Sequence, residues 1–201
     1  MASTTYLITG ANRGRQASLD LCPDMLLMQH RDWSGLGLGG FLSGPAKLHR
    51  HRHTLRSAKD QSSKLVVLKV DSQDEIDPKR AVAELTTMHN VHSLDVVIAN
   101  AGISRLWPSI EEARPSDMAE HYAVNVIALV LLFHAALPLL KASKQKPKFV
   151  TLGSTAGTLG DMEKWHTPNA VYGPSKAVLN WITKKIHLEH SDIIAFPIDP
   201  G

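Results

Sequence analysis

Strands and helices alternate along most of this chain, as the spacing of its hydrophobic positions indicates. From about residue 64 onward, each short apolar or β-branched run is followed by a stretch with apolar residues at helical spacing. Buried strands are predicted at 5–9, 65–70, 94–99, 148–152 and 193–198, and helices at 77–89, 116–143 and 170–189. This order predicts an α/β fold with a doubly wound, Rossmann-like parallel sheet in three layers, as a single domain over residues 1–201.

Residues 15–63 do not follow this pattern. They contain a Met/Leu patch at 25–28, five glycines between Gly35 and Gly44, and the basic run His49–His53. Gly35–Gly40 formally matches a dinucleotide-binding glycine motif, but the residues before it are polar and Pro45 follows soon after. We therefore expect a loop or a weak strand there, and we treat the segment as atypical within the single domain.

Composition and charge narrow the class of protein. Hydrophobic residues make up 43% of the chain and charged residues 20%, which excludes a mainly disordered protein. Cys22 is the only cysteine, so no internal disulfide forms and no cysteine-based metal site is expected. The N-terminus lacks a basic segment before its first strand, and the longest apolar run, 126–140, is interrupted by His134 and Pro138. These features predict a cytoplasmic protein without a signal peptide or membrane span.

A glycine turn follows the first predicted strand. In Thr9-Gly10-Ala11-Asn12-Arg13-Gly14, the glycines would let the backbone approach a pyrophosphate at the start of a helix. Arg13 adds a cation that could pair with the 2′-phosphate of NADP. The alternative is a strand-to-helix turn that binds no ligand.

Tyr172 and Lys176 form a second candidate site. They are four residues apart and would share one face of a helix, with Ser154 eighteen residues upstream at the end of a strand. A lysine ammonium beside a phenol favours phenolate, so we expect Lys176 to lower the pKa of Tyr172 and make it useful for proton transfer. The alternative is a solvated Tyr/Lys pair without a catalytic role.

Two further polar residues have competing interpretations. Asn125 lies among apolar neighbours in the long helix, where it either holds a proton-relaying water at a helix distortion or is a helix-packing amide. Asp71 follows a strand and either accepts from an adenine amino group or caps the next turn. The arginines within His49–His53 oppose metal binding, and no aromatic residues are interleaved there as in a nucleic-acid site. Neither a metal nor nucleic acid is expected as a ligand.

Taken together, these motifs resemble the short-chain dehydrogenase/reductase family. The ordered matches are Thr9-Gly10-x-x-x-Gly14, Asp71, Asn100-Ala101-Gly102, Asn125, Ser154, Tyr172-x-x-x-Lys176 and Pro200-Gly201. The stretches 160–164, 168–173 and 194–198 look like fungal carbonyl reductases of the norsolorinic acid ketoreductase group.

The resemblance implies an NADP(H)-dependent oxidoreductase, with NAD(H) possible, that acts on a ketone or secondary alcohol. Ser154 would orient the carbonyl, Tyr172 transfer the proton, Lys176 hold the nicotinamide ribose and Asn125 position the relay water. The implied cofactor-lining residues are Gly10, Asn12, Arg13, Gly14, Asp71, Asn100, Ala101, Gly102, Tyr172, Lys176, Pro200 and Gly201.

Departures from the family pattern give an alternative. Arg15-Gln16 replaces the usual Ile-Gly, and only Leu36, Leu38 and Phe41-Leu42 offer a glycine-weakened second strand. The chain also stops before the family's substrate-covering and dimer-forming region, so we expect a sheet incomplete at its second strand and C-terminal edge. The alternative is thus a relative that keeps the Ser/Tyr/Lys signature without a competent cofactor site. The expected partner is a small carbonyl compound, and the homo-oligomer usual for the family is not expected to be intact.

Overall fold

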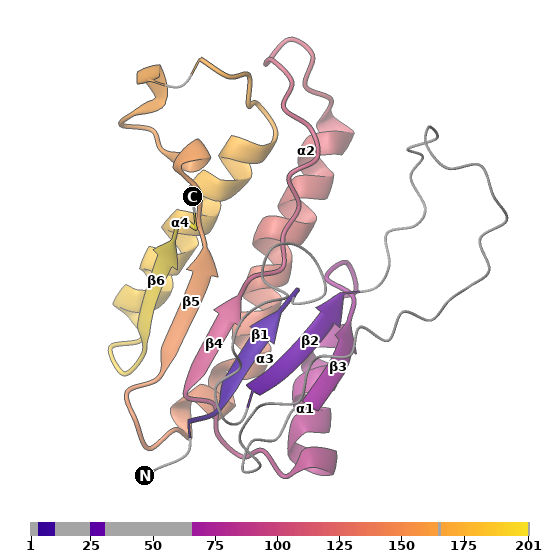
Figure 1. Cartoon of the computed structure of the whole chain (residues 1–201), viewed down its shortest axis with the longest axis vertical. Coiled ribbons are helices and arrows are strands. Elements are labelled where there is room, and N and C mark those ends of the chain that lie inside the picture. The colour runs from indigo at the N-terminus through magenta and orange to yellow at the C-terminus, as the bar shows by residue number, and fades with distance from the viewer. Residues whose placement is uncertain (1–3, 11–24, 31–65, 165, 201) are drawn as a thin grey trace, which may run out of the picture.

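A six-stranded, all-parallel sheet forms the centre of the computed structural model, which describes residues 4–10, 25–30, 66–164 and 166–200 (Figure 1). Its strands are β1 (Tyr6–Thr9), β2 (Met25–His30), β3 (Val66–Val70), β4 (Val96–Ala99), β5 (Lys148–Leu152) and β6 (Ile194–Ile198). They lie side by side in the order β3-β2-β1-β4-β5-β6. The α/β, Rossmann-like prediction is confirmed.

The second strand is where the sequence prediction was wrong. It is Met25–His30, which includes the Met/Leu patch, and it pairs in parallel with β1 on one side and with β3 on the other. The sheet is therefore continuous from β3 to β6, whereas Leu36, Leu38 and Phe41-Leu42 lie outside the described residues. Met and Leu are not the β-branched residues that mark a strand, so the pairing of its backbone with two neighbours, and not local propensity, defines β2.

Four α-helices belong to the described part of the chain, and in Figure 1 they lie behind the sheet. They are α1 (Asp77–His89), α2 (Pro115–Tyr122), α3 (Ala128–Lys141) and α4 (Tyr172–Glu189), with short 3₁₀ turns η3 (Thr155–Gly157) and η4 (Met162–Lys164). The long helix predicted over 116–143 is α2 and α3 joined by a π-helical turn, η2 (Ala123–Ile127). α1 packs on α3, and α4 packs on α2 and η2.

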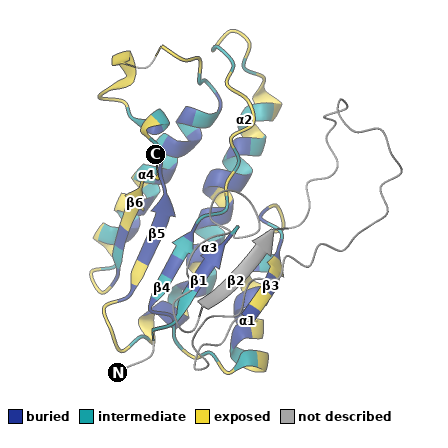
Figure 2. Cartoon of the chain, in the orientation of Figure 1, coloured by how far each residue is buried: buried dark blue, intermediate teal, exposed yellow. Residues whose placement is uncertain are grey.

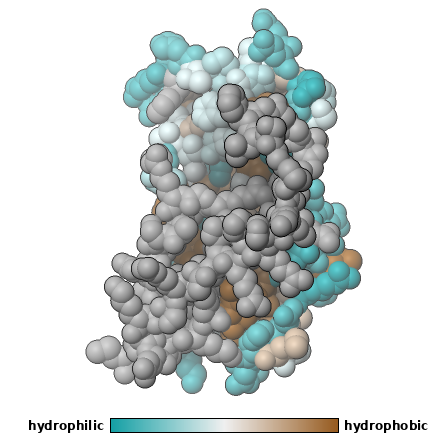
Figure 3. All heavy atoms as spheres, turned by 45° about the vertical axis from the view of Figure 1, so that its right-hand side comes forward, coloured by the Kyte–Doolittle hydropathy of each residue, from teal (hydrophilic) through white to brown (hydrophobic). Residues whose placement is uncertain are grey.

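The hydrophobic core lies between the sheet and these helices (Figure 2). Along β3 the residues Val66, Leu68 and Val70 are buried, while Val67 is 44% exposed, as expected for a strand with one face toward the core. At the centre, the Phe149 ring is fully buried and meets Phe133 edge to face at 5.1 Å. In the turned view of Figure 3, apolar surface appears between the grey atoms in the middle and lower part, and the upper end is mainly hydrophilic.

By length and composition alone, the helical run Pro115–Lys141 could cross a membrane. The sequence pattern predicted no membrane span, because the apolar run 126–140 is shorter and is interrupted. Half of its most apolar window is buried within the fold. Leu129, Leu132 and Phe133 belong to the core cluster, as in the central helix of many water-soluble domains.

Candidate active site

The carboxyl ends of β1 and β4 lie side by side at the point where the strand order reverses. From β1 the chain builds β2 and β3 on one side, and then β4, β5 and β6 on the other. In open α/β sheets, ligands bind in the crevice outside such a switch point. Residues that follow β1, β4 and β5 are therefore brought to one edge of the sheet, although they are far apart in sequence.

Thr9 connects the ends of β1 and β4. Its Oγ1 accepts hydrogen bonds from the backbone N–H groups of Asn100 and Ala101, both at 3.1 Å, and its carbonyl accepts from Asn100 Nδ2 at 2.8 Å. Gly10 follows with φ +69°, and a Cβ there would lie 2.7 Å from Ala101 Cα. Only glycine fits this close approach. Thr9 was not among the predicted site residues, although it begins the glycine motif.

A pocket opens beside this junction. It is lined by Thr9, Gly10, Val70, Ser72, Pro78, Ala99, Ala101, Val124, Ala128, Leu129 and Leu132. Its walls are largely apolar with a few polar groups, and its volume is about 30 Å³. The structure thus brings Gly10 and Ala101 of the predicted cofactor set to one pocket.

Ser154, Tyr172 and Lys176 come together one strand further along the sheet. Ser154 follows β5, and its Oγ caps η3 by accepting from Ala156 N at 3.2 Å. The Ser154 side chain lies near enough to Tyr172 to lower the pKa of the phenol. Lys176 lies one helical turn after Tyr172, with its Nζ 5.6 Å from the tyrosine ring centroid. The predicted trio is therefore assembled.

Burial changes the acid–base properties of this trio. Lys176 is 6% exposed, and burial lowers its pKa from 10.5 to about 8. The pKa of Tyr172 is raised, mainly by burial, although the neighbouring Ser154 side chain lowers it. We expected Lys176 to lower the pKa of Tyr172, and this was wrong: the Lys176 ammonium donates to Leu152 O at 2.6 Å, and the net effect of the surroundings favours the protonated phenol.

Asp199 adds a negative charge to the site. It follows β6, and its Oδ2 accepts from Thr155 N at 2.6 Å, next to Ser154. Its charge raises the pKa values of both Tyr172 and Lys176. Sequence reasoning noted Pro200-Gly201 and missed Asp199, whose signal is an acidic residue directly before that dipeptide.

Asn125 lies in the π-helical turn and is 1% exposed. Its Oδ1 accepts from Ile103 N at 2.8 Å, while its Nδ2 donates to Ile103 O and to Ser175 Oγ, both at 2.9 Å. A helix distortion was part of one of the two interpretations of Asn125, and the π-helical turn agrees with it, whereas the relay water stays a prediction. Both amide protons and Oδ1 bind protein groups, so the side chain ties the segment after β4 to α4.

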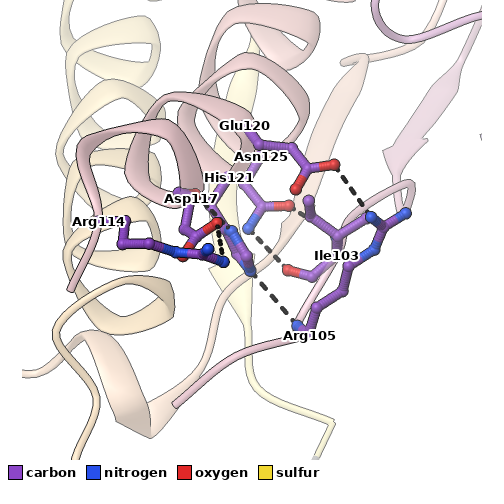
Figure 4. Close-up of polar contacts among 7 residues, drawn as sticks. All are labelled: Ile103, Arg105, Arg114, Asp117, Glu120, His121 and Asn125. Atoms are coloured by element: carbon purple, nitrogen blue, oxygen red, sulfur yellow. Dashed lines mark hydrogen bonds and ion pairs between the residues drawn. The ribbon is translucent and has the colours of Figure 1, made fainter. Parts of the chain in front are cut away.

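His121, one helical turn before Asn125, also binds the segment after β4 (Figure 4). Its ring is fully buried, with Nδ1 2.8 Å from Asp117 O and Nε2 accepting from Arg105 N at 3.3 Å. Because a carbonyl only accepts hydrogen bonds, the ring proton sits on Nδ1. The Arg105 guanidinium also pairs with Glu120 at 3.0 Å. His121 was not predicted, because a single histidine on a helix carries no motif.

Trp107 lies against the tyrosine of the trio. The two ring centroids are 5.5 Å apart, with the planes inclined by 30°. The indole Nε1 donates to Ser104 Oγ at 3.0 Å, and Trp107 remains 44% exposed. Sequence reasoning missed this residue because no spacing relates it to Tyr172.

The remaining predicted residues divide into three groups. Asp71 Oδ1 accepts from Gln73 N at 3.0 Å, so it does cap the following turn, and its adenine contact stays a prediction. Asn100 and Gly102 lie at the switch point, where a Cβ on Gly102 would be 3.2 Å from Asn125 Oδ1, and Pro200 is exposed after β6. Asn12, Arg13, Gly14 and Gly201 lie outside the described residues.

Sequence comparisons match this chain to a family of dehydrogenases. A family model described as short chain dehydrogenase matches residues 45–201. Norsolorinic acid ketoreductase from Dothistroma septosporum is 34% identical, over 98% of this chain and 71% of the relative. A short chain dehydrogenase from Penicillium aethiopicum is 36% identical, over 98% of this chain and 74% of the relative.

Solved structures give the same result. The NADPH-bound carbonyl reductase from chicken fatty liver superimposes with a TM-score of 0.79 at 28% identity, over 100% of this chain and 80% of the other. An NADH-dependent reductase in complex with NAD has a TM-score of 0.73 at 23% identity, covering 99% and 78% of the two chains, and therefore shows a shared fold.

Proposed function

Because this chain belongs to the short-chain dehydrogenase family, we propose that it is an NADP(H)-dependent ketoreductase that converts a ketone to a secondary alcohol. The observation that carries the proposal is the assembled trio: Ser154 is near enough to Tyr172 to lower its pKa, and Lys176 Nζ lies 5.6 Å from the centre of the tyrosine ring. Two hydroxyl groups next to a buried cation suit a carbonyl oxygen that gains negative charge during reduction.

In this mechanism the protein handles the oxygen atom of the substrate. When bound, reduced nicotinamide supplies a hydride for the carbonyl carbon. Tyr172 donates its phenolic proton to the carbonyl oxygen, so that the C=O bond becomes CH–OH, and Ser154 donates a hydrogen bond that orients the carbonyl. With its pKa raised above 10, the phenol of Tyr172 is protonated at neutral pH and can donate its proton.

Residues at the switch point would hold the cofactor. Gly10 and Ala101 would line the cofactor, and Lys176 would reach the nicotinamide ribose. Arg13 supports the preference for NADP(H), since a guanidinium pairs well with a 2′-phosphate. The NADPH-bound neighbour, at 28% identity, also supports it.

Thermal melting of the purified chain with NADPH or NADH is the first test. A ligand that binds the folded state raises the melting temperature, so we expect a larger rise with millimolar NADPH than with NADH. Equal shifts would contradict the NADP preference. No shift with either nucleotide would favour the alternative, a relative that has kept the signature without a competent cofactor site.

Turnover tests the chemistry. NADPH oxidation with ketones should fall by at least about 10²-fold in Tyr172→Phe, the scale of a lost general acid, while the shift with NADPH persists. Tyr122→Phe, a partly buried tyrosine at the end of α2, is the matched control and should retain turnover. Equal activity of the two variants would exclude Tyr172 as the proton donor.

A further inference from the structure

The proposed reaction does not use Trp107, yet its indole lies directly against the proton donor. The ring contact with Tyr172, at 5.5 Å between centroids, is made by a residue that is 44% exposed. The indole is thus packed on Tyr172 while nearly half of the residue's surface stays exposed. An exposed aromatic surface next to a catalytic hydroxyl needs an explanation.

The segment that carries Trp107 is fixed on both sides. Before it, Asn125 binds both backbone groups of Ile103, and His121 accepts from Arg105 N (Figure 4). After it, Pro108 O accepts a hydrogen bond from Ala170 N at 3.1 Å, two residues before Tyr172. The position of the indole is therefore set by contacts to α2, η2 and the start of α4.

The orientation of the indole is fixed as well. Its one polar atom, Nε1, donates to Ser104 Oγ within the same segment, so the ring is not oriented by a contact to Tyr172 alone. With that donor satisfied, the exposed remainder of the ring offers apolar and π surface to a ligand. Leu106 beside it is 39% exposed and extends the apolar edge.

We propose that Trp107 is a specificity-determining residue that binds a flat aromatic ring attached to the reacting carbonyl. This inference rests on the proposed function, because the carbonyl oxygen must reach Ser154 and Tyr172. An aryl ring held against the indole would place its attached carbonyl beside the two hydroxyls. Aromatic pairs gain affinity beyond the area they bury, so an aryl ketone would be preferred over a saturated ketone of similar size.

The test uses two ketones of similar size, acetophenone and cyclohexyl methyl ketone, with the full chain and NADPH. In Trp107→Leu, the ratio of kcat/KM for the aryl ketone to that for the saturated ketone should fall about 2- to 10-fold, mostly through KM. Trp107→Phe, which keeps an aromatic ring, should retain most of the ratio. Trp181→Leu, on the exposed face of α4, is the matched control. A loss of kcat for both ketones with an unchanged ratio would show that Trp107 only supports Tyr172, and would overturn the proposal.

Binding without turnover separates this inference from the proposed function. With NADP⁺, which carries no hydride, saturation-transfer NMR should detect acetophenone more strongly than cyclohexyl methyl ketone, and Trp107→Leu should remove the difference. If the chain shows this binding difference but reduces neither ketone, the proposed function is refuted, while the role of Trp107 in binding an aromatic ring is supported. Equal binding of both ketones by the unmodified chain would overturn the inference whether or not reduction occurs. If Trp107→Leu loses its cooperative melt, Trp107→Met provides the same comparison.

Discussion

The Lys176 ammonium donates a hydrogen bond to the carbonyl oxygen of Leu152, the last residue of β5, over 2.6 Å. A strand end therefore holds the cation from one side, while the Tyr172 ring lies 5.6 Å from it on α4. Burial of the ammonium costs free energy, because a charge loses water that one carbonyl replaces only in part. The buried ammonium thus lowers the stability of the fold at the site where we propose that it acts.

This cost gives a pH-dependent prediction. The pKa of Lys176 falls from 10.5 in the unfolded chain to about 8 in the fold. Between these values the unfolded chain binds more protons, so this group makes the free energy of unfolding rise with pH. The full effect is about 3 kcal/mol, at 1.36 kcal/mol per pKa unit. In Lys176→Met the rise between pH 8 and 9.5 should disappear from urea unfolding curves. Exposed Lys184→Met should keep it, and a rise that survives in Lys176→Met would contradict the assignment.

Asp199→Asn should shift the pH profile of ketone reduction. The Asp199 carboxylate raises the pKa of Tyr172, so its removal lowers that pKa. Reduction requires the protonated phenol, and the alkaline loss of kcat should begin at a lower pH in the variant. Asp161→Asn, in the loop after β5, is the control and should leave the profile in place. A shift to higher pH would exclude the electrostatic role of Asp199.

Gly10→Ala should destabilise the fold and weaken cofactor binding. The residue has φ +69°, and a Cβ would lie 2.7 Å from Ala101 Cα, so both backbone strain and a clash result. We expect a loss of about 1–3 kcal/mol in the free energy of unfolding. Gly160→Ala is the comparison, because a Cβ there meets nothing within 4 Å. Equal unfolding midpoints for the two variants would show that the turn at Gly10 relaxes without cost.

Asn125→Ala should loosen the segment that carries Trp107. The substitution leaves the backbone groups of Ile103 and the Ser175 hydroxyl without the amide that now binds them. We expect about 2–4 kcal/mol of destabilisation, because the buried Ser175 hydroxyl and two partly buried backbone groups lose a partner. Hydrogen exchange at the Ile103 amide should also become faster. Thr87→Ala, which removes an exposed hydroxyl from α1, should cost within about 0.5 kcal/mol. Unchanged exchange at Ile103 would show that other contacts suffice.

Regular patterns in the sequence were enough to predict most of the sheet and helices. The helix 77–89 and the strand 148–152 have the predicted bounds, because their hydrophobic spacing and their ends agree. Met25–His30 was missed because a strand paired on both sides is defined by its neighbours and needs no β-branched pattern of its own. The join between α2 and α3 was missed in detail, since a π turn leaves the apolar periodicity almost unchanged.

The residues of the candidate site were likewise predicted only in part. Ser154, Tyr172 and Lys176 were predicted because their spacing fits a strand end and one helix face, and the structure assembles them. Trp107 and Asp199 were missed because each reaches the trio from another loop, through a contact that only the fold creates. The pKa of Tyr172 was predicted with the wrong sign, because a helix-spacing argument contains no information about burial.

The arrangement of the strands also determines when the molecule can form during synthesis. Thr5 and Asp95 are joined by backbone and side-chain hydrogen bonds across 90 positions, and β1 pairs with β4 in the middle of the sheet. Contacts between distant parts of a chain slow folding, because the loop must close before the contact is gained. On the ribosome, β1 therefore waits until β4, about 90 residues later, has emerged before its β4 edge is covered, and during that interval it is open to pairing with other chains.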